Sequence, residues 1–350
     1  MSLEKKDGNV TIYDIAHRAE ASASTVGAVM NGTWKSRRIS EKRAELILSI
    51  ASEMGYSRNM QASALRRERT HIIGMIIPMY NSRYFSSIAQ RFEHEARARG
   101  LFPMVSCTSR DPELEQATVE QMLSYRVDQI VCTGATDPDA IATLCEKHGV
   151  PAINLDLPGS RGPSIISDNY QGAYDLTRGL LSRLRARDLP SEANLLFVGG
   201  RPKEHNTSER VRGFRNALKD AGVAQEPDLL LTCGYARHKA INALDELSAS
   251  GRRMPAAIFV NSTESLEGVM RWFRSRADQN INDVSFGCFD WDPFATFINS
   301  DVLMVRQNVV EMTDILFNWI DNGNVKHTDV LEVQPTIVKA ASLEAMMIED

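Results

Sequence analysis

The sequence predicts an α/β protein with a small helical unit at its N-terminus and a larger body of two doubly wound lobes. Apolar residues fall at helical spacing between residues 10 and 51, whereas from residue 72 short apolar runs alternate with helical patterns, as in parallel sheets built from βαβ units. Charge divides the chain at the same place. Residues 1–70 hold 12 Lys or Arg and 8 Asp or Glu, a net charge of +4, and the other 280 residues hold 28 and 37, a net charge of −9.

Two short helices joined by a tight turn are predicted between residues 11 and 31. Thr11 can cap the first helix, with Asp14 able to reach back to it, and Ser22 is a natural N-cap for the second helix. Ser40 caps a third helix in the same way. This order of elements is that of a helix-turn-helix domain.

The second helix carries a face of short, mostly uncharged side chains, which suits close approach to base edges in a DNA groove. The loop after it is basic, and a basic head on an acidic body is the asymmetry expected of a DNA-binding domain joined to something else. The alternative is an ordinary helical hairpin packed on a domain. We predict DNA contacts in the head at Thr11, Ser22, Ala23, Ser24, Thr25, Ala28, Asn31, Lys35, Arg37 and Arg38.

The body is predicted from its apolar runs to contain strands at 72–78, 101–106, 129–133, 152–156, 195–199, 229–232, 257–261 and 284–289. Helical patterns lie between them at 84–99, 114–125, 169–187 and 208–221. So many units indicate two similar lobes rather than one sheet.

Ligands of open α/β sheets bind beyond the carboxyl ends of the strands, so polar residues at those ends are candidates for a site. Each has an ordinary alternative: a helix cap for Asp156 or Asn261, a surface ion pair for Arg210, core packing for Trp291. Taken singly, only Asp290 favours the site over its alternative. Carboxylates and amides suit the hydroxyls of a neutral ligand, and aromatic rings can cover its apolar face. A sugar or polyol ranks first, a sugar acid second and a nucleobase third.

Seven motifs in order give the chain a resemblance to the lactose/galactose repressor family of bacterial regulators. They are Val-Thr-Ile-Tyr-Asp-Ile-Ala at 10–16, Ser-Ala-Ser-Thr-Val at 22–26, Val-Met-Asn-Gly at 29–32, Ile-Ser-Glu at 39–41, Met-Gly-Tyr at 54–56, Asn-Met-Gln-Ala-Ser-Ala-Leu at 59–65 and Thr-His-Ile-Ile-Gly at 70–74. The resemblance implies a sensor like the periplasmic sugar-binding proteins, with two lobes, three crossovers and a cleft. It implies cleft residues at Tyr84, Phe85, Asp156, Asn206, Arg210, Asn261, Asp290, Trp291 and Gln307.

The resemblance also implies the domain limits. The head covers 1–58, a hinge helix or linker covers 59–70, the first lobe covers 71–168 with 302–330, and the second covers 169–301 with 331–350. Residues Asn59 to Leu65 would become helical on operator DNA, with Leu65 wedged into the minor groove from both halves of a dimer. Composition alone favours a plain linker helix there.

Three positions depart from the family pattern. Glu20 stands in the helical turn where Gly is usual, Ala28 stands where many members have an Arg that reads guanine, and Ser63 replaces a common hinge Arg. The loop at 33–38 is longer and more basic than usual, so we infer that it adds phosphate contacts and hence affinity. The operator sequence therefore does not transfer from relatives.

The cysteines and the absence of several motifs in the sequence argue against metal-binding, nucleotide-binding, exported and membrane proteins. The five cysteines are scattered without metal-ligand spacing and read as reduced thiols of a cytoplasmic protein. No P-loop, Gly-x-Gly-x-x-Gly after the first strand, signal peptide or membrane span is present, so we expect no cofactor, no metal, no membrane partner and no enzyme activity.

We predict a homodimeric repressor of palindromic operator DNA whose DNA affinity a sugar or polyol controls allosterically. The alternatives are a small-molecule binding protein with only non-specific DNA affinity, and an enzyme, which would turn its ligand over.

Overall fold

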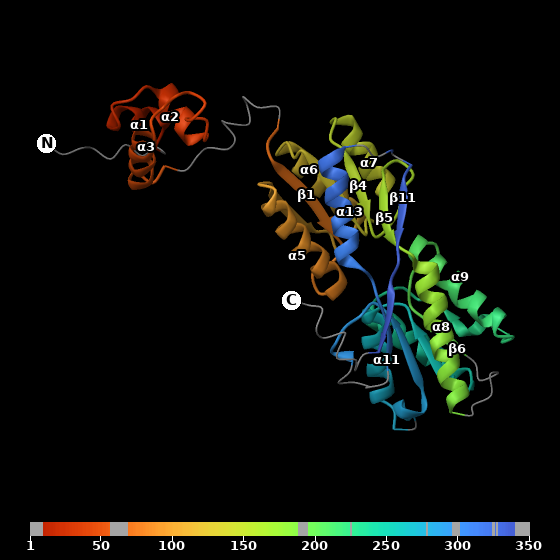
Figure 1. Cartoon of the computed structure of the whole chain (residues 1–350). Helices are drawn as coiled ribbons and strands as arrows, with labels where there is room; N and C mark the ends of the chain where they lie inside the picture. The colour runs from red at the N-terminus through yellow and green to blue at the C-terminus, as the bar shows by residue number, and fades with distance from the viewer. Residues whose placement is uncertain are drawn as a thin grey trace. The chain divides into compact units, whose positions relative to one another are not determined.

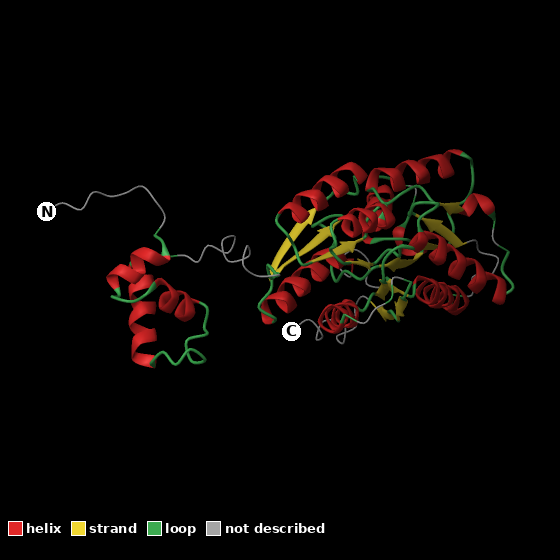
Figure 2. Ribbon diagram, turned by 90° about the horizontal axis from the view of Figure 1, so that it is seen from above, coloured by secondary structure: helices red, strands yellow, loops and turns green. Residues whose placement is uncertain are grey.

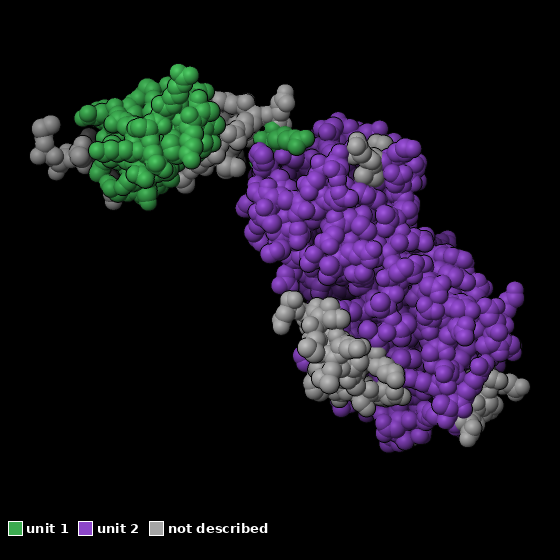
Figure 3. All heavy atoms as spheres, viewed as in Figure 1, with its two compact units in different colours: residues 1–70 green, residues 71–350 purple. Residues whose placement is uncertain are grey.

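The computed structural model describes residues 10–56, 69–187, 195–224, 226–277, 279–295, 302–323, 326 and 328–339. The chain forms two compact units, residues 1–70 and 71–350 (Figure 3). Asn59, Ser63 and Leu65, on which the hinge prediction depends, lie outside the described residues.

The first unit is a three-helix domain whose helices begin where the sequence predicts. Thr11 and Asp14 form a capping box, Ser22 accepts a hydrogen bond from the backbone N–H of Thr25 at 3.1 Å, and Ser40 caps the third helix. The three helices pack around buried Ile15, Val26 and Ile47. They are α1 Ile12–Arg18, α2 Ala23–Met30 and α3 Glu41–Glu53.

Glu20 lies in the turn between α1 and α2 with φ at 48°. A glycine adopts this left-handed conformation without cost, whereas a glutamate is strained there. The guanidinium of Arg43 donates to the backbone carbonyl of Glu20 at 2.5 Å, which ties the strained turn to α3. The departure from the family's glycine is therefore accommodated in the helix-turn-helix.

The second unit holds two six-stranded sheets with helices packed around them (Figures 1 and 2). The first sheet has the order β11-β5-β4-β3-β1-β2 and is parallel throughout. Its elements are β1 Ile72–Ile77, α5 Arg83–Ala98, β2 Phe102–Cys107, α6 Pro112–Ser124, β3 Gln129–Thr133, α7 Pro138–Lys147, β4 Ala152–Leu155, β5 Ser164–Ser167, α13 Val309–Asn322 and β11 Val330–Val333.

The second sheet repeats this order as β12-β10-β9-β8-β6-β7 and is parallel except for the β10–β12 pair. Its lobe holds α8 Asn169–Ala186, β6 Leu195–Val198, α9 His205–Asp220, η1 Pro227–Leu229, β7 Leu230–Leu231, α10 Arg237–Ala249, β8 Ala257–Val260, α11 Thr263–Arg274, η2 Ile281–Asp283, β9 Ser285–Phe289, β10 Leu303–Arg306 and β12 Thr336–Lys339. The common order makes β4 and β9 equivalent strands of the two lobes.

The chain crosses between the lobes after β5, after β10 and after β11, as Figure 1 shows. The predicted limits at 302 and 331 are wrong by a few residues, because β10 pairs with β9 of the second sheet and β11 pairs with β5 of the first. The prediction also missed β5, β10, β11 and β12 as strands. Each of the four is a four-residue segment that includes at least one polar residue, so none forms a continuous apolar run, and nothing local in them specifies which sheet they join.

Candidate functional site

Two aspartates occupy equivalent positions in the two lobes. Asp156 directly follows β4 and Asp290 directly follows β9, and their backbones are left-handed, with φ of 78° and 76°. A non-glycine residue with positive φ is uncommon, and such strain gathers at functional sites. Both aspartates line one cavity between the lobes, so the carboxyl ends of the equivalent strands converge on one place.

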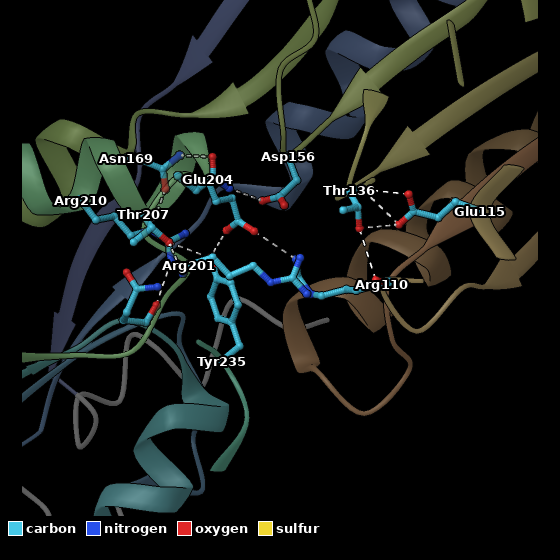
Figure 4. A network of polar contacts seen from close by, with 12 residues as sticks. Arg110, Glu115, Thr136, Asp156, Asn169, Arg201, Glu204, Thr207, Arg210 and Tyr235 are labelled. Atoms are coloured by element: carbon cyan, nitrogen blue, oxygen red, sulfur yellow. Dashed lines mark hydrogen bonds and ion pairs between the residues drawn. The ribbon is translucent and has the colours of Figure 1, made fainter. Parts of the chain in front are cut away.

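Asp156 is buried, with 4% of its surface exposed. One carboxylate oxygen, Oδ1, accepts from the hydroxyl of Tyr84 at 3.1 Å and from the amide of Asn206, on α9 of the other lobe, at 3.2 Å. Burial raises the pKa of Asp156 to about 6, and the positive charges of Arg210 and Arg110 oppose that rise. The carboxylate therefore lies at the contact between the lobes (Figure 4).

Arg210, on α9, is 3% exposed and donates to the side-chain oxygen of Asn169 at 2.8 Å and to the backbone carbonyl of Asn261 at 2.7 Å. Its guanidinium carbon lies 3.6 Å from the centre of the Phe289 ring. Burial raises the pKa of Asp290, while Arg210 and a hydrogen bond donated by Gln307 oppose the rise. Arg210 thus compensates the buried carboxylates.

The structure brings seven of the nine predicted cleft residues into one cavity: Tyr84, Phe85, Asp156, Asn206, Arg210, Asp290 and Gln307. Trp291 lines a neighbouring hollow instead, together with Arg83 and Arg306. Asn261 meets Arg210 through its backbone, and its buried side-chain amide has no hydrogen-bond partner among the described residues.

The cavity has a volume of about 30 Å³, room for about one or two water molecules. A sugar can enter only if the lobes part or their side chains move. The space around Asp156 is therefore narrow, whereas the neighbouring hollow, which Tyr84, Asp290 and Gln307 also line, has a volume of about 630 Å³.

The prediction missed seven residues that line the cavity, and two of them, Arg110 and Tyr235, lie against each other there. Arg110 lies beyond the carboxyl end of β2, so the rule that ligands bind at the carboxyl ends of strands could have identified it. Tyr235 follows β7, a strand of only two residues, so its position in the sheet carried no readable pattern. The guanidinium of Arg110 lies 4.7 Å from the centre of the Tyr235 ring.

The head exposes most of the residues predicted to contact DNA. Ser22 and Ser24 are exposed at the start of α2, and Lys35, Arg37 and Arg38 are exposed in the basic loop. Thr11 and Asn31 are also exposed, and Ala23 and Thr25 are partly buried.

Ala28 corrects the prediction. It is 4% exposed, and the loop after α2 folds back so that the N–H of Thr33 donates to its carbonyl at 2.9 Å. A methyl contact from Ala28 to a base is therefore absent from this conformation.

Comparison with known proteins identifies the family. Residues 11–59 match the model of bacterial regulatory proteins of the lacI family, and residues 70–341 match the model of periplasmic binding proteins and the sugar binding domain of the LacI family. The chain belongs to the lacI family. This confirms the resemblance, the fold class and the class of function: a DNA-binding transcriptional repressor with a sensor of the sugar-binding type.

Two relatives illustrate the similarity of this lacI-family regulator to repressors. The ribitol operon repressor of Klebsiella aerogenes is 56% identical over 192 residues, which cover 55% of this chain and 71% of that protein. The sucrose operon repressor of Klebsiella pneumoniae is 30% identical over 321 residues, 90% of this chain and 94% of that one.

Among solved structures, the lac repressor dimer bound to operator and the anti-inducer ONPF matches this regulator with a TM-score of 0.78 at 21% identity, over 95% of this chain and 98% of that one. In the described part of the regulator, no helix is long and apolar enough to cross a membrane.

Proposed function

We propose that this regulator represses its target operon in response to a neutral polyol or sugar held in the cavity between the lobes, and that a pentitol such as ribitol is the first ligand to test. The convergence of Asp156 and Asp290 on one cavity carries the proposal. The amides of Asn206 and Gln307 stand beside them. Carboxylate and amide groups in such number bind the hydroxyls of a polyhydroxylated chain.

The rings of the site suit the same class of ligand. Tyr84 and Phe85 line the cavity with their ring centres 5.0 Å apart. Such a surface can cover the carbon backbone of a sugar while the polar groups engage its hydroxyls. The similarity to the ribitol operon repressor favours a linear five-carbon polyol, and the similarity to the sucrose operon repressor places sugars in the same class.

The cavity is built from both lobes, so a ligand there changes the free energy of one lobe arrangement relative to another. It shifts the equilibrium only by its differential affinity for the two, typically about 1–3 kcal/mol. The first lobe begins at β1, directly after the segment that joins it to the head. We propose that movement of the first lobe alters the spacing of two heads in a homodimer on a palindromic operator. We also propose that the protein binds and releases the ligand without converting it chemically.

Titration of ribitol into the full-length protein, followed by calorimetry and by thermal unfolding, tests the proposal. Ligand at about 100 times Kd should stabilise the sensor by about 2.7 kcal/mol. Asp290→Asn should weaken that binding, and Ser208→Ala, on the same helix as Arg210 but absent from the cavity lining, serves as the matched control. The proposal is overturned if neither ribitol nor any other neutral polyol or sugar alters the stability of the protein.

A further inference from the structure

An ion pair joins the two lobes at the edge of the cavity. A terminal guanidinium nitrogen of Arg110, in the loop between β2 and α6, lies 3.5 Å from a carboxylate oxygen of Glu204, which precedes α9 in the other lobe. Only 10% of each side chain is exposed. Figure 4 shows the pair reaching across the cleft, with Tyr235 beside it.

Glu204 occupies the N-cap position of α9 but forms no capping hydrogen bond. Ser, Thr, Asp and Asn are the residues that stabilise such a position, and glutamate is not among them. The carboxylate of Glu204 is instead directed into the cleft, where one oxygen accepts from the hydroxyl of Tyr235 and the other faces Arg110. The side chain of Glu204 therefore contacts residues at the cavity and does not cap α9.

Arg110 is held as an anion-binding group would be. It and Ser109 both have left-handed backbones, with φ of 57° and 54°, which direct the loop toward the cavity that Arg110 lines. The aromatic rings of Tyr235 and Phe85 lie 4.7 Å and 5.7 Å from its guanidinium. Its buried Nε has no hydrogen-bond partner among the described residues. A free guanidinium in this position would bind a carboxylate or phosphate with two parallel hydrogen bonds.

The rest of the cavity does not compensate an anionic ligand. Three carboxylates line it, Asp156, Asp290 and Glu264, and the other lining arginine, Arg210, already donates to Asn169 and Asn261. Glu204 already neutralises Arg110, so an anion that paired with the remaining guanidinium nitrogens would add a further negative charge to this carboxylate-lined cavity, and one that displaced Glu204 would leave a mostly buried carboxylate without its cation.

We propose that Glu204 determines the charge of the ligand: by neutralising Arg110 it restricts the cavity to uncharged polyols and sugars and excludes sugar acids and sugar phosphates. The inference rests on the proposed function of the same cavity, and it makes Glu204 a specificity residue. Removing the carboxylate frees Arg110 for an anion.

Calorimetric titration of the full-length protein with ribitol, ribitol 5-phosphate and ribonate tests the inference. Glu204→Gln keeps an oxygen for Tyr235 but loses the charge, and it should gain affinity for the two anions by about tenfold or more relative to wild type. Glu204→Asp should show a gain in the same direction, because the shorter carboxylate draws back from Arg110 and can cap α9. That second variant keeps the test valid if Glu204→Gln does not fold.

Two controls separate release of Arg110 from a general change of charge. Glu264→Gln removes the same charge from the cavity wall without removing the partner of Arg110, so its gain for anions should be much smaller. Adding Arg110→Gln to Glu204→Gln should abolish the gain.

The inference is overturned if wild type binds the anions at least as tightly as ribitol, if neither Glu204 variant gains anion affinity, or if Glu264→Gln gains as much. Failure of wild type to bind neutral polyols and sugars would refute the proposed function instead. The change in anion affinity in the Glu204 variants still decides the inference in that case.

Discussion

Replacing Asp156 by asparagine is expected to stabilise the sensor at neutral pH while weakening its ligand binding. Both hydrogen bonds to Asp156 end on the same oxygen, so the amide oxygen of asparagine can accept from Tyr84 and Asn206 as the carboxylate does. Asparagine also tolerates the left-handed backbone at this position. The substitution therefore removes the charge and keeps both hydrogen bonds, while the other carboxylate oxygen becomes an amide nitrogen.

The magnitude follows from the pKa of Asp156, which burial raises from 3.8 to about 6. Because the folded state holds the proton more tightly than the unfolded state, the stability that Asp156 contributes is fully present below pH 3.8 and is lost as pH rises through about 6. Ionising the buried group then costs about 3 kcal/mol at pH 8 and about half of that at pH 5. Asp156→Asn should recover these amounts.

Urea denaturation of the full-length protein at pH 5 and pH 8, followed by tryptophan fluorescence, measures the two differences. Asp156→Asn should exceed wild type in free energy of unfolding at both values, with the larger gain at pH 8. Equal gains at the two pH values, or a less stable variant at pH 8, would show that burial of an ionised carboxylate is not the cost we assign to it.

Other predictions concern Arg210 and the head. Arg210→Met should abolish ribitol binding and lower the free energy of unfolding by about 3–5 kcal/mol, because it leaves buried carboxylates uncompensated; a urea midpoint equal to that of wild type would contradict this. Ser22→Ala should destabilise the head by about 1 kcal/mol through loss of the cap on α2, and unchanged hydrogen exchange of the head amides would count against it. Lys35→Ala should weaken binding to all DNA sequences alike and flatten its salt dependence; a loss confined to one sequence would instead indicate base readout.

The parts of the structure that depend on local chemistry were predictable from the sequence. The caps Thr11, Ser22 and Ser40 were identified because each side chain bonds to backbone within three residues of itself. Asp156 and Asp290 were identified because both directly follow apolar strands, and the ends of parallel strands gather at one edge of a sheet.

Contacts between distant segments were not predictable in the same way. Arg110 and Glu204 are 94 residues apart, and neither has a neighbour that marks it as half of a pair. Ala28 has helical spacing on the expected outer face of α2, yet it is buried in the folded head. Likewise β10 and β11 read alike as short apolar runs, and only the assembled sheets decide which lobe each joins.

We propose that a ligand in the cavity and operator DNA on the head shift the same conformational equilibrium, in opposite directions or in the same direction. The measurement that tests it most directly is fluorescence anisotropy of the full-length protein on a palindromic site selected from random-sequence DNA, at physiological salt, with and without saturating ribitol. We predict binding to the selected site at least about a thousandfold tighter than to random DNA. We also predict that ribitol changes the operator affinity by the same factor by which operator changes the ribitol affinity. Equal affinity for selected and random DNA, or an operator affinity indifferent to bound ribitol, would contradict it.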